Sequence, residues 1–117
     1  MLASKYRLSG KKIFEKVLKE GRFVQSPSFG VAYLEDDSSD ISHFGFVVST
    51  KVSKEAVTRN RVKRALSEAV RFLMDKINKS YNVVFLAKGN STKASTDVLM
   101  GEVREALQKA GITNNWK

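Results

Sequence analysis

The chain has 117 residues, and its 21 Lys and Arg against 12 Asp and Glu give it a formal net charge of +9. A hydrophobic share of 42% can form a packed core, so we expect one globular domain over residues 1–117 and exclude intrinsic disorder. The lack of Cys excludes disulfides and thiolate metal sites, and a single His is too few for a zinc cluster. No apolar run approaches the roughly 20 residues of a membrane span, and the start lacks the apolar stretch of a secretory signal. We therefore expect a soluble, cytoplasmic protein with an anionic partner and no membrane partner.

The charge is distributed unevenly along the chain. Residues 1–22 and residues 51–71 each carry seven basic and two acidic side chains, a net charge of +5 each. Residues 23–50 contain four acids and no Lys or Arg, which gives this segment a net charge of −4. Because a local excess of charge decides which surface meets a polyanion, we expect two separate segments to supply the basic surface.

The first half of the chain predicts a helix followed by a strand. Apolar residues recur at helical spacing over Lys11–Glu20, with Ser9 as a candidate N-cap and Gly21 as the stop. After the interruption at Pro27, a strand is predicted to begin at Ser28 or Phe29 and to run to Leu34. The polar residues that follow are typical of a hairpin loop, which predicts that the next strand returns beside this one.

The second half predicts the returning strand over residues 44–49, a long helix over residues 57–78, a buried strand over residues 81–87 and a final helix over residues 96–110. Gly111 would end the last helix. The apolar stripe of the long helix consists of Val62, Leu66, Ala69, Val70, Leu73 and Ile77. The order α-β-β-α-β-α predicts a single-domain α+β sandwich in which helices cover a small sheet.

The long helix also predicts a polar face opposite its apolar stripe. This row consists of Asn60, Arg64, Ser67 and Arg71, flanked by Arg61 and Lys63. If the helix opens near Thr58, Arg59, Asn60 and Arg61 lie in its first turn, where basic residues oppose the helix macrodipole and need another explanation. Guanidinium forks, an Asn amide and helix amides suit phosphate oxygens and ribose hydroxyls. The alternative is a solvated basic face without a ligand.

The stretch from Lys51 to Arg64, which contains Arg59-Asn60-Arg61, closely resembles the signature of the protein subunit of bacterial ribonuclease P. Arg7-Leu8, the first predicted helix and the strand ending at Lys88 extend the resemblance over nearly the whole chain. The resemblance implies a protein that binds a catalytic RNA and helps it remove the 5′ leader from precursor tRNA. It also implies a left-handed crossover between parallel strands, although handedness statistics favour a right-handed one.

The resemblance implies two groups of binding residues. The RNA-binding residues would be Lys51, Lys54, Arg59, Asn60, Arg61, Lys63, Arg64 and Arg71. The cleft for the single-stranded leader would be formed by Phe14, Leu18 and Phe29, with Lys88 at its edge. The family often has a further aromatic residue in the first strand, where this chain has Ala32. Tyr33 is not expected to replace it, since adjacent strand residues point to opposite faces. The alternative for the three apolar residues is an ordinary core role.

No nucleophile–His set, paired catalytic carboxylates or phosphate-binding Gly-rich loop occurs in the sequence. We therefore expect the protein alone to be inactive and to bind no cofactor, as the accessory subunit of an endoribonuclease whose RNA acts with Mg²⁺. The alternatives are a ribosomal-type or general RNA-binding protein and a protein-only nuclease. No DNA partner is expected, because strands surround the basic helix. His43 is interpreted as a surface or strand-edge residue, and the role of Trp116 is open between base stacking and docking on the domain.

Overall fold

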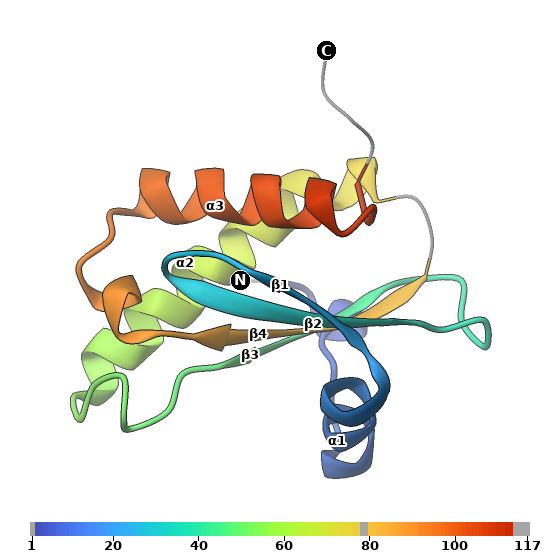
Figure 1. Cartoon of the computed structure of the whole chain (residues 1–117), viewed down its shortest axis with the longest axis horizontal. Coiled ribbons are helices and arrows are strands. Elements are labelled where there is room, and N and C mark those ends of the chain that lie inside the picture. The colour runs from blue at the N-terminus through green and yellow to red at the C-terminus, as the bar shows by residue number, and fades with distance from the viewer. Residues whose placement is uncertain (1, 78–79, 114–117) are drawn as a thin grey trace.

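The computed structural model describes residues 2–77 and 80–113, in which four strands form one mixed sheet between helices (Figure 1). Helices α2 (Ala56–Leu73) and α3 (Thr96–Lys109) lie on one face, and α1 (Lys11–Glu20) lies on the other. The strands are β1 (Arg22–Gln25), β2 (Phe29–Glu35), β3 (His43–Val47) and β4 (Tyr81–Ala87). This arrangement confirms the predicted α+β sandwich.

The spatial order of the strands is β1-β2-β4-β3, with β3 and β4 parallel and the other neighbours antiparallel. The predicted hairpin between β2 and β3 is therefore wrong, because β4 lies between them. The near-continuous apolar run of β4 suits this central position, where both faces are covered. The connection β3–α2–β4 joins parallel neighbours, as the resemblance implies, and its left hand stays a prediction.

Strand β1 is an element that the sequence reasoning missed. Its register pairs Phe23 with Ala32 and Gln25 with Gly30 of β2. Pro27 lies in the turn between the two strands, where its missing N–H interrupts no ladder. The signal that could have revealed β1 is this Pro-containing turn between two short apolar segments, which is typical of an antiparallel pair.

The helix boundaries agree with the predicted ones at both ends of α1 and at the start of α3, and they differ at both ends of α2 and by one residue at the end of α3. The N-cap of α1 is Gly10 rather than Ser9, and its φ of 101° explains the glycine. Helix α2 begins at Ala56 and ends at Leu73, and a 3₁₀ turn over Met74–Lys76 follows it. The predicted extension of the helix through Ile77 is therefore wrong, and Ile77 lies beyond the helix rather than in its apolar stripe. Helix α3 is capped by the Ser95 hydroxyl, which accepts a hydrogen bond from the Val98 N–H at 3.2 Å.

The two faces of the sheet have separate cores. The larger core lies between the sheet and helices α2 and α3, where Phe29 and Phe85 are fully buried with ring centroids 5.4 Å apart. The smaller core lies beneath α1 and consists of Val17, Ala32 and Val84. One helix therefore packs on this second face, where two helices pack on the first.

The segment before α1 covers the outer edge of β3. Arg7 forms a parallel bridge with Phe44, and the Leu8 N–H donates a hydrogen bond to the Phe44 carbonyl at 2.8 Å. Leu2 is 2% exposed and belongs to the larger core. Across residues 2–77 and 80–113, no helix combines the length and apolar character needed to cross a membrane.

Candidate nucleic-acid interface

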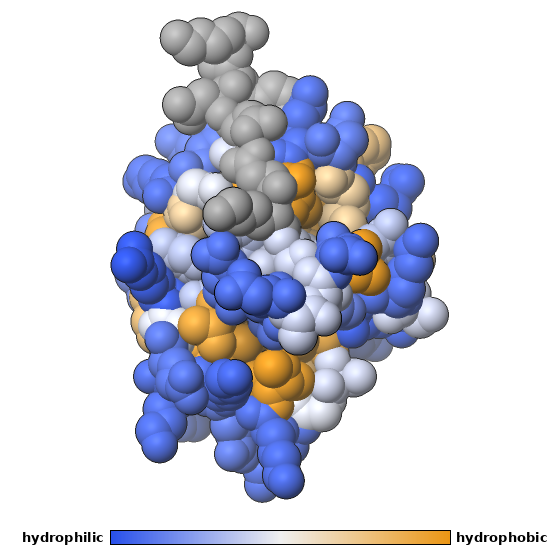
Figure 2. Space-filling view, turned by 90° about the vertical axis from the view of Figure 1, so that its right-hand side faces the viewer, coloured by the Kyte–Doolittle hydropathy of each residue, from blue (hydrophilic) through white to orange (hydrophobic). Residues whose placement is uncertain are grey.

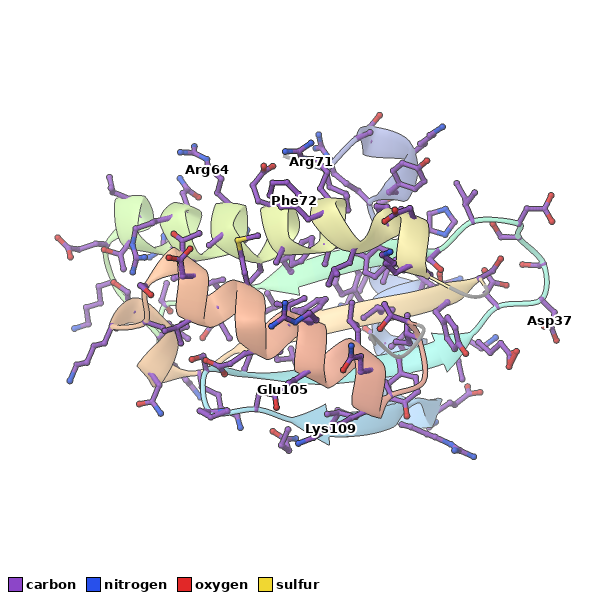
Figure 3. The ribbon with its side chains drawn as sticks, turned by 90° about the horizontal axis from the view of Figure 1, so that it is seen from above. Asp37, Arg64, Arg71, Phe72, Glu105 and Lys109 are labelled. Atoms are coloured by element: carbon purple, nitrogen blue, oxygen red, sulfur yellow. The ribbon has the colours of Figure 1, made fainter. Side chains whose placement is uncertain are left out.

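The exposed side of α2 carries most of the predicted RNA-binding residues. Asn60, Lys63, Arg64 and Arg71 are all exposed. Figure 3 shows Arg64 and Arg71 projecting from the edge of α2 that faces away from α3. Within the described part of the chain, the side chain of Arg64 has no hydrogen bond or ion pair to another residue. All five of its N–H donors are therefore available to a ligand.

Two arginines of the motif also hold the structure together. The Arg59 guanidinium donates to the Ser53 carbonyl at 2.9 Å, and the Arg61 guanidinium donates to the Thr92 carbonyl at 2.7 Å. The first bond fixes the loop before α2, and the second fixes the turn after β4. Each guanidinium keeps further N–H donors, because it has five. Arg59 and Arg61 can therefore position α2 and still contact phosphates.

Arg71 differs from Arg64 because it is paired within its own helix. Its guanidinium donates to the Glu68 carboxylate at 2.8 Å and lies 5.1 Å from the centroid of the Phe72 ring. The pKa of Glu68 is lowered to about 2, and the hydrogen bonds from Arg71 are the largest cause. A phosphate must therefore compete with a carboxylate for Arg71.

The structure corrects two predictions about α2. Ser67 is 2% exposed, and its hydroxyl donates to the Arg64 carbonyl at 3.1 Å, so it does not belong to the exposed row. The helix begins at Ala56, which places Arg59 fourth in the helix and Asn60 and Arg61 in the second turn. The argument from the macrodipole of the first turn is therefore wrong for these residues.

Lys51 and Lys54 lie before α2, in the loop that follows β3, and both are exposed. This loop is held close to the helix, because the Arg59 side chain bonds to it and the Val52 N–H donates to the Ser49 carbonyl at 3.0 Å. The two lysines thus extend the basic surface beyond the first turn of α2. Together with the half-buried Arg59 and the exposed residues of the helix, they form what we call the α2 basic face: Lys51, Lys54, Arg59, Asn60, Arg61, Lys63, Arg64 and Arg71.

The opposite side of the sheet holds the second candidate surface. The Phe14 ring lies against Gly45 of β3, where an added Cβ would overlap it, and Leu18 one turn later is 36% exposed. Between them on the helix, Val17 is fully buried against Ala32 and Val84. Helix α1 thus buries Val17 and leaves the neighbouring stripe of Phe14 and Leu18 accessible beside the sheet.

Phe29 does not belong to this surface. Because side chains alternate along β2, Phe29 points to the α2 and α3 side, where it is fully buried, whereas Ala32 points to α1. The prediction of Phe29 in the cleft is therefore wrong, and its alternative, a core role, holds. Tyr33 also lies on the α2 and α3 side, with its ring centroid 6.3 Å from that of Tyr81. It does not replace an aromatic residue at Ala32, as expected.

Lys88 follows the last residue of β4 and is exposed. Its ammonium group donates to the Ser26 carbonyl at 2.8 Å, and its N–H donates to the Ser28 carbonyl at 2.8 Å. These bonds hold the cation beside the β1–β2 turn. The turn is held from the α3 side as well, since the Glu102 carboxylate accepts hydrogen bonds from the N–H and the hydroxyl of Ser28.

A cavity of about 200 Å³ connects the two candidate surfaces. Phe14 and Gly45 line it from the α1 side, Lys63 and Ser67 line it from α2, and Phe46 lies between them. Sequence reasoning assigned Phe14 and Lys63 to different surfaces and did not foresee that they share a cavity. The missing information was the position of β3, which places Gly45 against Phe14 and in the same cavity as Lys63 of α2.

His43 and Asp36 belong to no candidate metal site among the described residues. His43 is half-buried at the start of the edge strand β3, as its interpretation required. Asp36 is held in the 35–40 loop by hydrogen bonds from Ser38, which lower the pKa of its carboxyl. Among the residues that the structure describes, no group of three or more His, Cys, Asp or Glu is placed to bind a metal ion. Trp116 lies outside the described residues.

An α+β fold with an exposed basic helix beside a partly open sheet face defines a class of RNA-binding proteins, and comparisons with known proteins identify the family. The family model described as Ribonuclease P matches residues 2–111. The chain is 33% identical over 107 residues to the ribonuclease P protein component of Symbiobacterium thermophilum, covering 92% of each chain. It is 36% identical over 101 residues to that of Clostridioides difficile, covering 86% of this chain and 87% of the other.

Solved structures agree with this match. The RNase P protein of Staphylococcus aureus superposes with a TM-score of 0.86 at 25% identity, covering 93% of this chain and 98% of the other. The RNase P protein of Thermotoga maritima in complex with 1-(4-fluorophenyl)-2-thiourea superposes with a TM-score of 0.72 at 29% identity, covering 89% and 95%. The chain belongs to the ribonuclease P protein family. It is thus the accessory protein subunit of an endoribonuclease, the ribonucleoprotein that processes tRNA.

Proposed function

We propose that the two surfaces of this subunit bind different parts of the assembly: the α2 basic face binds the catalytic RNA, and the groove between α1 and the sheet binds the 5′ leader of precursor tRNA. The observation that carries the first part is the exposure of Arg64, whose guanidinium is free for a bidentate phosphate contact. Arg59 and Arg61 support it, since their bonds to loop carbonyls hold α2 in place.

The groove suits a single strand for a different reason. Unpaired bases stack on aromatic and apolar side chains while nearby cations neutralise the backbone. Phe14 and Leu18 offer apolar surface along α1, and Lys88 supplies a cation at the far end of β4. Figure 2 shows apolar side chains reaching the surface in the lower half of the molecule, where α1 lies, between hydrophilic ones.

In this proposal the RNA subunit, with bound Mg²⁺, performs the hydrolysis, and the protein binds no cofactor of its own. The protein contributes positive charge that screens phosphate repulsion between leader and catalytic RNA, which favours metal binding and substrate binding together. The basic surplus of residues 1–22 and 51–71 supports this role. We propose the cytoplasm as the site of the assembly.

The direct experiment is a cleavage assay of the purified protein with precursor tRNA, with and without the cognate catalytic RNA and Mg²⁺. Cleavage is expected only when the RNA is present, and the protein should lower the RNA concentration and the Mg²⁺ concentration needed. Cleavage by the protein alone would contradict the proposal. A general RNA-binding protein would bind mature and precursor tRNA equally in the complex, whereas a leader-binding groove predicts tighter binding of the precursor.

A further inference from the structure

Phe23 on the edge strand β1 is 49% exposed although it is a large aromatic side chain. Its partner in the register of β1 and β2 is Ala32, and residues directly opposite each other in an antiparallel pair point to the same face. Ala32 lies in the small core beneath α1. The Phe23 ring is therefore on the sheet face that carries α1, at the β1 edge of that face.

The register aligns the residues of this sheet face in two rows that cross all four strands. The row under α1 consists of Phe23, Ala32, Val84 and Gly45, and the row beside it consists of Gln25, Gly30, Leu86 and Val47. Neither row contains an acid. Val17 of α1 covers Ala32 and Val84 in the first row, so Phe23 lies on the β1 side of the helix and the Phe14 ring, which lies on Gly45, is on its β3 side.

The ring of Phe23 is not needed to anchor β1. Val24, the next residue, points to the opposite face and packs against the larger core, so it attaches β1 to the domain. The residues of β2 next to Phe23 on this face are small. Ala32 lies directly opposite Phe23, and Gly30 lies two positions from Ala32 on the same face. A half-exposed aromatic ring next to small residues has a free surface on which a planar group can stack.

Two polar groups follow this ring along the chain, at Gln25 and beside Ser26. The Gln25 side chain lies over Gly30, where an added Cβ would be 3.0 Å from its Oε1 atom, and it points to the same face as Phe23. Ser26 follows Gln25 in the chain, and its carbonyl accepts a hydrogen bond from the ammonium group of Lys88 at 2.8 Å. An aromatic face, an amide and a cation thus follow one another along the end of β1.

From this juxtaposition we propose that Phe23 and Gln25 form a second subsite for the leader, in which an unpaired base stacks on Phe23 while Lys88 neutralises its phosphate. This inference rests on the proposed leader-binding function and extends the groove from α1 to β1. Stacking on aromatic rings tolerates any base, so the subsite should respond to leader length rather than to leader sequence.

The test uses the holoenzyme reconstituted with the cognate catalytic RNA and precursor tRNAs whose leaders increase in length. Phe23→Ala should lower the affinity for long-leader precursor by roughly 5-fold to 10-fold, the lower part of the range for loss of one stacked base. It should leave the affinity for the shortest-leader precursor unchanged. Phe23→Trp should keep the preference for long leaders, and Phe23→Leu should lose most of it. The matched control is Phe72→Ala, which removes an aromatic ring of 61% exposure from α2 and should leave the leader-length dependence unchanged.

Equal losses for all leader lengths, or unchanged affinity for the long leader, would overturn the inference. A change in self-association of the free subunit without a change in leader affinity would do the same, because it would assign the ring to a contact between two copies. Circular dichroism of each variant controls for unfolding. Phe14→Ala separates the two proposals: if it weakens leader binding and Phe23→Ala does not, only the β1 subsite fails. If neither variant does, the leader-binding function fails.

Discussion

The two faces of the sheet are built from similar residues and differ in how completely helices cover them. On the α2 and α3 side, Phe29, Phe44 and Phe85 are at most 1% exposed. On the α1 side, the single short helix buries Val17 and leaves Phe14, Leu18 and Phe23 partly or largely accessible. The role of an aromatic residue in this chain thus depends on the sheet face to which it points. On the α2 and α3 side it is a core residue, and on the α1 side it is a candidate binding residue.

The largest expected difference between the two faces of the sheet is in how much the loss of an aromatic ring lowers the stability of the fold. Phe29→Ala should lower the free energy of unfolding by about 3–5 kcal/mol, because it leaves a cavity in the larger core. Phe14→Ala should cost less than half as much, since its ring is only partly buried. Urea denaturation of both variants measures the difference. Equal losses would mean that the α1 side is as much a core as the other side.

A substitution at Gly45 sharpens the comparison without removing an aromatic residue. Gly45→Ala places a Cβ where the Phe14 ring lies, and the partly exposed ring is expected to move outward. Overpacking of this kind costs about 1–3 kcal/mol, and here we expect the lower end because the ring can leave. Unfolding measurements give this cost, and binding of precursor tRNA by the holoenzyme should show a loss of leader preference similar to that of Phe14→Ala. Unchanged leader preference would show that the position of the Phe14 ring does not matter.

The α2 basic face contains one arginine whose side chain has no partner among the described residues, Arg64, and one that is paired with a carboxylate, Arg71, so the two can be compared. Arg64→Ala should flatten the dependence of log affinity for the catalytic RNA on log salt concentration by about one unit, the effect of one lost phosphate contact. Arg71→Ala should change the slope less, because Arg71 must first leave Glu68. Filter binding over a salt series measures both slopes. A larger change for Arg71 would contradict the assignment of Arg64 as the main contact.

The smallest expected effect is the pH dependence of the Glu68–Arg71 pair. The folded-state pKa of Glu68 is about 2, below its ordinary value of 4.5, so the pair stabilises the folded protein above about pH 4.5. This stabilisation should be lost as the pH falls from about 4.5 to about 2. Thermal melts of the wild type and Glu68→Gln should therefore differ at neutral pH and converge near pH 2. A difference that persists at pH 2 would mean that Glu68 acts through something other than its charge.

Periodicity and turn residues predicted the helices and three strands, because these signals are local. The bounds of α1 and β4 agree with the prediction, and the core stripe of α2 is buried from Val62 to Leu73. Strand pairing was not predictable in the same way. The insertion of β4 between β2 and β3 depends on long-range contacts, which leave no periodic signal in the segment between the strands.

The parts of the candidate site that depend on local sequence were predicted, and the parts that depend on contacts with distant segments were not. The Arg59-Asn60-Arg61 motif identified the basic helix, and exposure of Arg64 follows from helical spacing. The bonds of Arg59 and Arg61 to carbonyls, and the burial of Ser67, depend on neighbouring segments and could not be inferred. Phe29 was misplaced for a simpler reason: a strand has two faces, and its apolar pattern does not say which one faces α1.

The central claim is that the α2 basic face and the α1 groove bind different RNA partners. The most direct test measures, in the reconstituted holoenzyme, the affinities of Arg64→Ala and Phe14→Ala for the catalytic RNA and for precursor tRNA with and without its leader. Arg64→Ala should weaken binding of the catalytic RNA and leave the leader preference intact. Phe14→Ala should reduce the leader preference and leave binding of the catalytic RNA intact. If both variants weaken both interactions to the same degree, the separation of the two surfaces is contradicted.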